Sequence, residues 1–81
     1  MKLINKTRLH FSSENSDKIY EVDLVEVSEC KNQYLVNFRY GRRGQTLREG
    51  TKTPTAVAKA EAQKLFDSVV IAKLNKGYVD V

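Results

Sequence analysis

The residues best able to do chemistry gather in one short segment, Asn37 to Gly44, where an aromatic side chain is followed by a glycine and two arginines. Arginine guanidinium groups match phosphate oxygens, and an aromatic ring offers a flat surface on which a base can stack. Glycines at positions 41 and 44 let the backbone approach a ligand closely. The segment therefore predicts a nucleic-acid contact at Tyr40 and the residues beside it. The competing interpretation is a hairpin whose ring packs in the core while its arginines face water.

Charge is unevenly distributed along the chain, although the net charge is only +4. Residues 14–29 hold six acids and one lysine, whereas residues 39–52 hold five cations and one acid. Such segregation predicts a basic region that attracts anions and a separate acidic region. The simpler interpretation is that both are solvated faces that keep a small protein soluble. From charge and proximity alone we nominate four cations near Tyr40, namely Arg39, Arg43, Arg48 and Lys52.

Few residues combine into a catalytic or metal-binding set. His10 is the only histidine and Cys30 the only cysteine. A nucleophilic pair of these two residues needs a third group to orient the histidine, and the sequence offers none. One cysteine forms neither an internal disulfide nor a cysteine-based zinc site. We therefore predict no catalytic residues, no metal and no cofactor, and we interpret Cys30 as incidental and His10 as a surface residue.

Length and composition restrict the function classes further. A chain of 81 residues has room for one small core, so we predict a single domain over residues 1–81 without a deep, enclosed active site. The hydrophobic share of 41% and the charged share of 30% are typical of a soluble fold. No apolar run approaches the roughly 20 residues of a membrane span, and the first residues lack the apolar stretch of a signal peptide. We expect a cytoplasmic protein without membrane contact.

Alternation with a period of two predicts an antiparallel sheet of about four strands. The predicted strands run from Leu3 to Phe11, from Lys18 to about Val27, from Tyr34 to Tyr40 and, as a weaker edge strand, from Gln45 to Thr53. Polar turns at residues 12–17 and 28–32 and the segment 41–44 separate them. A change of phase at Val25 and Val27 predicts a bulge, or burial on both faces, near the end of the second strand.

After Thr53 the hydrophobic period changes to about 3.6, which predicts a helix of about 20 residues that ends near Gly77. Thr53 or Thr55 is the predicted N-cap. Charged residues such as Lys73 fall mostly off the apolar stripe, which comprises Ala58, Ala62, Leu65, Phe66, Val69, Val70 and Ala72. Because one helix cannot bury such a stripe alone, it must pack across one face of the sheet. The predicted fold is a two-layer α+β structure.

The segment around Tyr40 also resembles the signature of the WGR domain, a module named for its Trp-Gly-Arg motif. Tyr40-Gly41-Arg42 stands in that position, and residues 33–42 resemble the central strand of the family. The resemblance continues on both sides of the motif. It includes residues 18–22, residues 50–53, the helical segment 60–66 and the closing Lys76-Gly77-Tyr78. Together these segments cover nearly the whole chain.

The resemblance implies a sheet with one packed helix and a role as an accessory module. WGR domains occur in DNA-dependent poly(ADP-ribose) polymerases, where they contact the end of a broken DNA strand, and in bacterial proteins similar to molybdate-metabolism regulators. It implies that Tyr40 stacks near a terminal nucleotide and that Arg42 contacts the DNA backbone or a neighbouring domain. Tyrosine in place of tryptophan reduces the stacking area and adds a hydroxyl group.

Two hypotheses from different classes follow. The first is a non-enzymatic module that binds DNA or another nucleic acid, at its phosphate backbone or ends, through Tyr40, Gly41, Arg42, Arg43, Arg39, Arg48 and Lys52. The second is a protein-interaction module in which the basic hairpin, or the acidic region around Glu21, Asp23 and Glu26, contacts another protein domain. An enzyme is a distant third hypothesis that would need turnover dependent on Cys30.

Overall fold

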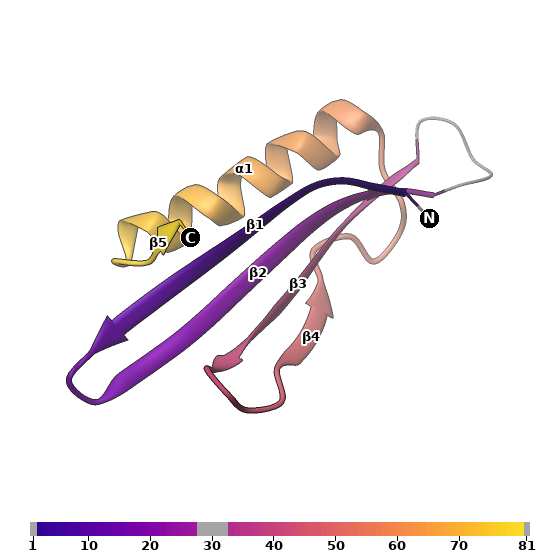
Figure 1. Cartoon of the computed structure of the whole chain (residues 1–81). Helices are drawn as coiled ribbons and strands as arrows, with labels where there is room; N and C mark the ends of the chain where they lie inside the picture. Colours follow the sequence, from indigo (N-terminus) through magenta and orange to yellow (C-terminus); the bar gives the residue numbers. More distant parts are fainter. Residues whose placement is uncertain (1, 28–32, 81) are drawn as a thin grey trace.

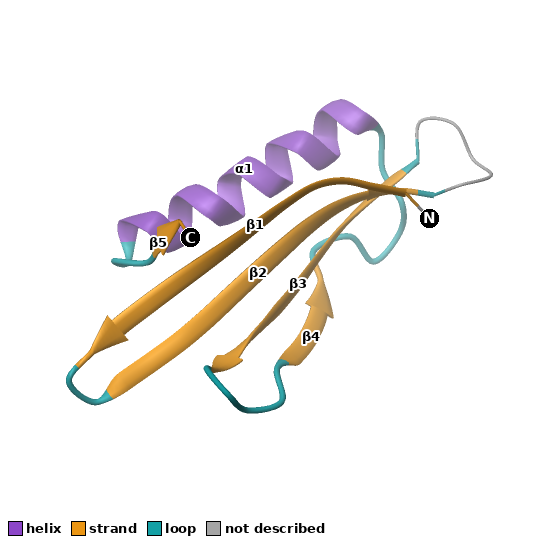
Figure 2. Ribbon diagram, in the orientation of Figure 1, coloured by secondary structure: helices purple, strands orange, loops and turns teal. Residues whose placement is uncertain are grey.

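The computed structural model describes residues 2–27 and 33–80, which form an antiparallel sheet and one helix (Figure 1, Figure 2). The elements are β1 (Lys2–Ser13), β2 (Ser16–Glu26), β3 (Tyr34–Arg42), β4 (Arg48–Thr51), α1 (Lys59–Asn75) and β5 (Val79–Asp80). Their order across the sheet is β4-β3-β2-β1-β5. The α+β arrangement is confirmed, but with five strands instead of about four. The predicted turn at residues 28–32, with Cys30, lies outside the described residues.

The first hairpin has a shorter turn than the sequence predicted. β1 and β2 pair continuously up to Ser13 and Ser16, so only residues 14 and 15 form the turn. A two-residue connection fits the twist of the flanking strands, and exposed polar side chains do not interrupt the ladder. At the end of the hairpin far from the turn, the register shifts between Leu3 and Asn5, opposite Val25.

The bulge expected near the end of the second strand therefore lies on β1 and not on β2.

β5 was not predicted, because two residues give no periodicity to recognise. Gly77 has a φ of 102° and ends the helix, and the chain then pairs with β1 at Leu9 and His10. A Cβ atom at Gly77 would lie 3.2 Å from the ring of Phe11. Glycine is needed there both for the positive φ and for this close approach.

The helix begins later than predicted and lacks the predicted threonine cap. Ala58 occupies the N-cap position without a side-chain cap bond. Thr53 is buried instead, where its Oγ1 accepts a hydrogen bond of 3.0 Å from the backbone N–H of Val36. Val57 then forms a bridge with Tyr34. Because these bonds tie the connection to β3, residues 53–58 cannot enter the helix.

The core lies between α1 and one side of the sheet, which we call the helix side. Its buried residues are Leu9, Tyr20, Val22, Leu24, Tyr34 and Val36 from the strands and Ala62 and Phe66 from α1. Leu65, Val69 and Val70 pack at its margin, but Ala58 and Ala72 are exposed, so the apolar stripe is narrower than predicted. The other side of the sheet has no helix over it, and we call it the open face (Figure 2). Among the described residues, no helix combines the length and apolar character needed to cross a membrane.

Candidate nucleic-acid interface

Tyr40 lies near the end of β3 on the helix side, directly opposite Tyr20 of β2. The rings of Tyr20, Phe38 and Tyr40 stack on one another, with centroids 5.7 to 6.1 Å apart. Tyr20 is 5% exposed, whereas Tyr40 is 40% exposed. Tyr40 is therefore the outer ring of a packed group, partly held by its neighbours and partly open to solvent.

Two more rings extend this group toward the end of α1. Tyr78 lies edge-on to Tyr20, with centroids 6.4 Å apart, and tilted against Phe11 at 5.5 Å. Burial raises the pKa of the Tyr20 hydroxyl, and the neighbouring phenols at 40 and 78 add to this shift. The Tyr20 hydroxyl therefore stays neutral around physiological pH. We call these five rings (Phe11, Tyr20, Phe38, Tyr40 and Tyr78) the aromatic surface.

Two lysine ammonium groups lie over the aromatic surface. Lys73 Nζ is 4.5 Å from the ring centroid of Tyr20 and 5.7 Å from that of Tyr78. Lys52 Nζ is 5.2 Å from the ring centroid of Phe38. The negative face of an aromatic ring attracts a cation without neutralising its charge. Both ammonium groups therefore remain able to attract an anion.

The lysines also repel one another. Partial burial lowers the pKa of Lys73 below its ordinary value, and the charges of Lys76, Lys52 and Lys18 lower it further. A bound anion would relieve this repulsion, since an opposite charge favours the charged form of the amine. A hollow of about 310 Å³ lies at this point, lined by Phe11, Lys18, Lys73, Lys76 and Tyr78.

Arg42 and Arg48 add two more cations to the helix side. Arg42 is in register with Lys18, and Arg48 is in register with Tyr40. Residues opposite each other in an antiparallel pair project to the same side of the sheet. The Nη2 atom of Arg42 approaches the carbonyl oxygen of Asn15 within 3.5 Å. Among the described residues, neither arginine forms an ion pair with an acid.

Two glycines make room for this arrangement. Gly41 lies inside β3, which continues through Arg42, and not in a loop after the strand as the sequence predicted. A Cβ atom at Gly41 would lie 3.2 Å from Leu47, so the glycine lets the chain fold back closely beside the strand. A Cβ atom at Gly50 would lie 2.5 Å from the ring of Phe38. From the sequence, Gly50 was expected in an edge strand without a packing role, although an isolated glycine in a strand often marks such a close approach.

Arg39 lies on the open face, on the opposite side of the sheet from Tyr40. Its guanidinium nitrogens are 2.9 Å from Glu21 Oε1 and 3.3 Å from Asp23 Oδ2. The hydrogen bond with Glu21 raises the pKa of Arg39. Arg8 reaches the same carboxylate, with 3.5 Å between its Nε and Oε2. Strand register aligns these charges across the sheet as a charge ladder of alternating sign, in the order Arg8, Glu21, Arg39 and Glu49.

β2 does not present the separate acidic region that the sequence predicted. The side chains of Glu21 and Asp23 are only 12% and 16% exposed, and both contact arginines. The Glu26 carboxylate accepts a hydrogen bond of 2.9 Å from the hydroxyl of Tyr34. The acidic strand lies between two strands that carry cations, so pairing in the sheet neutralises much of its charge.

The match to a known family covers almost the whole chain. The family model described as WGR domain matches residues 4–81. The chain belongs to the WGR family. No curated protein and no solved structure matches it. A WGR domain is a small module and not a catalytic domain, and the family is consistent with nucleic-acid or protein interaction in general.

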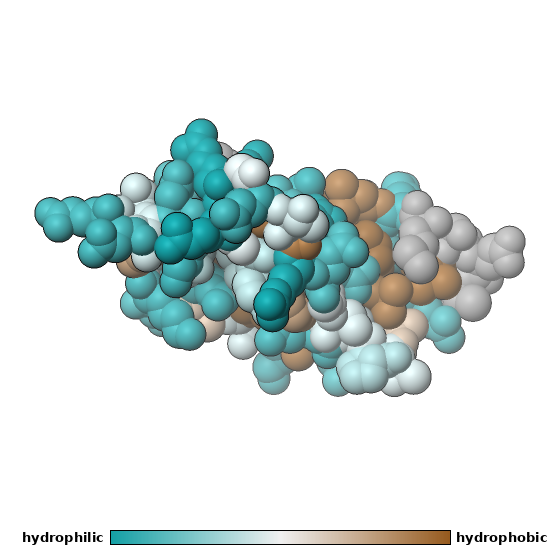
Figure 3. Space-filling model, turned by 90° about the horizontal axis from the view of Figure 1, so that it is seen from below, coloured by the Kyte–Doolittle hydropathy of each residue, from teal (hydrophilic) through white to brown (hydrophobic). Residues whose placement is uncertain are grey.

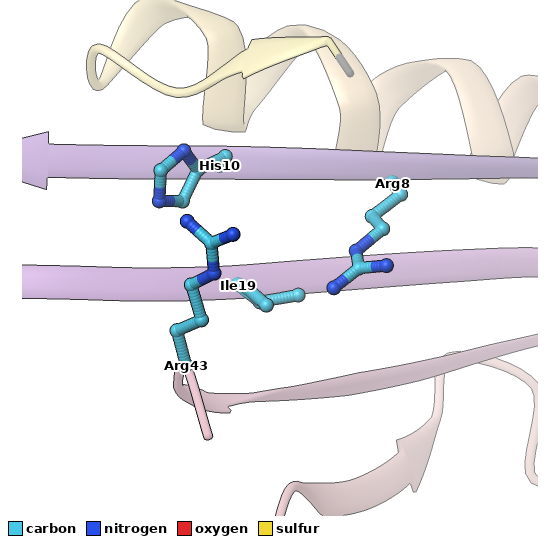
Figure 4. A pocket seen from close by; sticks show the side chains of 4 residues that line it. All are labelled: Arg8, His10, Ile19 and Arg43. Atoms are coloured by element: carbon cyan, nitrogen blue, oxygen red, sulfur yellow. The ribbon is translucent and has the colours of Figure 1, made fainter. Parts of the chain in front are cut away.

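The structure of this WGR domain divides the predicted contact residues between the two sides of the sheet. Tyr40, Arg42, Arg48 and Lys52 lie together on the helix side. Arg39 and Arg43 do not join them. The backbone N–H of Arg43 donates a hydrogen bond of 2.9 Å to the carbonyl oxygen of Asp17, and its side chain lines a pocket on the open face (Figure 4).

Three lysines beside the aromatic surface were not predicted from the sequence as contact residues, namely Lys18, Lys73 and Lys76. Lys73 was counted among the charged residues that lie mostly off the apolar stripe, yet its ammonium lies over Tyr20. Two sequence features indicated these lysines. Lys18 precedes Tyr20 by two residues, so both side chains point to the same side of the strand, and Lys76 follows Lys73 by three residues at the end of the helix.

The space-filling view shows that hydrophilic side chains predominate toward the end of the molecule that carries the β1–β2 turn (Figure 3).

The remaining chemical candidates do not assemble into a catalytic or metal site within the described residues. His10 is half-buried, and its Nε2 contacts the carboxylate of Asp17. No group of three or more potential metal ligands comes together in residues 2–27 and 33–80. Cys30, the other member of the nucleophilic pair considered from sequence, lies outside these residues.

Proposed function

We propose that this WGR domain is a non-enzymatic module that binds DNA or another nucleic acid on its helix side, at ends, nicks or single-stranded segments. The observation that carries the proposal is an aromatic surface with one exposed ring, surrounded by cations that repel one another. We call these cations the cationic border, and they comprise Lys18, Arg42, Arg48, Lys52, Lys73 and Lys76.

Tyr40 supplies the stacking contact in this proposal. Tyr20 and Phe38 already fix the orientation of its ring, so little side-chain freedom is lost when a base or sugar packs on it. Stacking of a base on an aromatic side chain contributes about 1–3 kcal/mol and does not depend on which base is present. A base offers a free face for stacking at an end, a nick or a single-stranded segment. We therefore expect these nucleic-acid forms to be the preferred ligands.

The cationic border supplies the phosphate contacts. Each neutralised phosphate releases counterions, so affinity falls steeply as salt rises. The slope of log affinity against log salt should correspond to about three to five phosphates. Stacking on an aromatic ring and contacts with phosphates do not distinguish one base from another. We therefore expect weak binding that has little preference for base sequence and that depends strongly on ionic strength.

Fluorescence anisotropy with short labelled nucleic acids tests the proposal. The set comprises a blunt duplex, a nicked duplex, a single strand and a matched RNA, each at low and at moderate salt. We expect the nick or the single strand to bind best, and both Tyr40→Leu and Arg42→Gln to weaken that binding. Arg43→Gln is the matched control, because it removes the same charge from the adjacent residue on the open face.

Two outcomes would contradict the proposal. If the folded protein binds none of these nucleic acids even at low salt, the module acts instead through another protein domain. If Arg43→Gln weakens binding as much as Arg42→Gln does, contact is not restricted to the helix side.

A further inference from the structure

The open face carries a pocket that the proposed function does not use. It has a volume of about 310 Å³ and lies between β1, β2 and the residue that follows β3. Its lining consists of Arg8, His10, Ile19 and Arg43. Figure 4 shows the two guanidinium groups on either side of Ile19, with the imidazole ring beside the group of Arg43.

Contacts with the surrounding strands hold the walls of this pocket in place. The backbone of Arg43 is hydrogen-bonded to Asp17, and the side chain of Asp17 contacts the imidazole of His10. The Nε atom of Arg8 faces Glu21, so this contact leaves the Nη nitrogens of Arg8 for another acceptor. Within the described residues, the guanidinium of Arg43 forms no ion pair.

The floor and the walls of the pocket favour different parts of one ligand. Ile19 is 5% exposed and provides an apolar floor for a hydrocarbon group. The guanidinium groups of Arg8 and Arg43 provide paired donors whose geometry matches a carboxylate. A single anion between these groups would be attracted by both.

We propose that this pocket binds one carboxylate attached to a short apolar chain, as presented by an apolar C-terminal residue of a partner protein. A nucleic-acid backbone is disfavoured here, because its successive phosphates would pass the carboxylates of Asp17 and Glu21 and be repelled. A single carboxylate brings one negative charge to the pocket, whereas a phosphate backbone brings several. The open face is then a protein-contact surface that is independent of nucleic-acid binding on the helix side.

Nuclear magnetic resonance titration of the full chain tests this site directly. The probe is isovalerate, with isovaleramide as its neutral isostere and inorganic phosphate as the competing anion. We expect saturable shifts of the Ile19 methyl, His10 ring and Arg43 Nε–H resonances with isovalerate and none with the amide. Arg43→Gln should weaken isovalerate binding about tenfold, the effect of losing a charged hydrogen-bonding partner, while Arg48→Gln should leave it unchanged.

Three results would overturn the proposal. Shifts that do not saturate, or that the amide reproduces, would show that the carboxylate is not recognised. Tighter binding of phosphate than of isovalerate would assign the pocket to a phosphorylated ligand. Equal losses in Arg43→Gln and Arg48→Gln would mean that the anion responds to overall charge and not to this pocket. Because Arg43 lies away from Tyr40, failure here would leave the nucleic-acid proposal unaffected.

Discussion

The two sides of the sheet use their cations in different ways. On the open face, Arg39 lies between the carboxylates of Glu21 and Asp23, which neutralise its charge. On the helix side, Lys73 and Lys52 lie over aromatic rings, which attract the cations but leave their charge in place. The comparison teaches that strand register, more than local sequence charge, decides which cations are available to a ligand.

The largest effect that we predict comes from overpacking the aromatic rings on the helix side. Gly50→Ala places a methyl group where the Phe38 ring now lies, at 2.5 Å, so the ring must move away from Tyr20 and Tyr40. We expect a loss of about 2 kcal/mol in the free energy of unfolding, measured by urea denaturation. Nucleic-acid affinity should fall with it.

Gly44→Ala is the comparison for this prediction. Nothing lies within 4 Å of a Cβ atom at Gly44, but its φ of 83° disfavours alanine. It should cost about 1 kcal/mol through backbone strain alone and leave the aromatic surface intact. If Gly50→Ala is as stable as the unmodified protein, the rings are not tightly packed.

The next largest effect comes from removing an ion pair of the charge ladder on the open face. Glu21→Gln removes the carboxylate shared by Arg39 and Arg8, and it leaves Arg39 with Asp23 alone. We expect the free energy of unfolding to fall by about 1–2 kcal/mol. Glu49→Gln, at the end of the same charge ladder, should change it by less than about 0.5 kcal/mol. Equal effects of the two changes would show that the ladder acts through overall charge only.

A third prediction concerns how the ionisation of Lys73 on the helix side makes stability depend on pH. The folded structure lowers the pKa of Lys73 below its ordinary value of 10.5. Between the lowered value and 10.5 the unfolded chain binds more protons, so this group makes stability rise with pH in that window. The difference in stability between the unmodified protein and Lys73→Gln should therefore shift in favour of the unmodified protein as pH approaches 10.5. Thermal unfolding at several pH values measures it, and a constant difference would contradict the lowered pKa.

The smallest effect that we predict is a change in the salt dependence of nucleic-acid binding, which distinguishes the two sides of the sheet. Lys73→Gln should reduce the slope of log affinity against log salt by about 0.9 for a duplex, the contribution of one phosphate contact. Arg39→Gln removes an equal charge from the open face and should leave the slope unchanged. Anisotropy titrations over a salt series provide both values. A reduced slope in Arg39→Gln would extend the nucleic-acid contact to the charge ladder.

A period of two in the strands and of about 3.6 after Thr53 predicted the sheet and the packed helix, whereas the sequence left open whether the Tyr40 ring packs in the core or contacts a ligand. The same alternation implied that Arg39 and Tyr40 face opposite sides, but proximity in sequence outweighed it in the choice of candidates. The pairing of Glu21 with Arg39 depends on strand register, which no local pattern contains. The place of Lys73 over Tyr20 depends on how the helix lies across the sheet, which only tertiary packing determines.

The two-residue strand β5 links parts of the molecule that otherwise have separate roles. It follows Tyr78 directly and pairs with β1 only at Leu9 and His10. Few hydrogen bonds hold it, so it is among the segments that open most readily by local unfolding. One such opening would withdraw Tyr78 from Tyr20 and at the same time expose the backbone of His10, which borders the pocket on the open face. The C-terminal segment thus connects the two surfaces, and a change in the pairing of β5 with β1 would affect both.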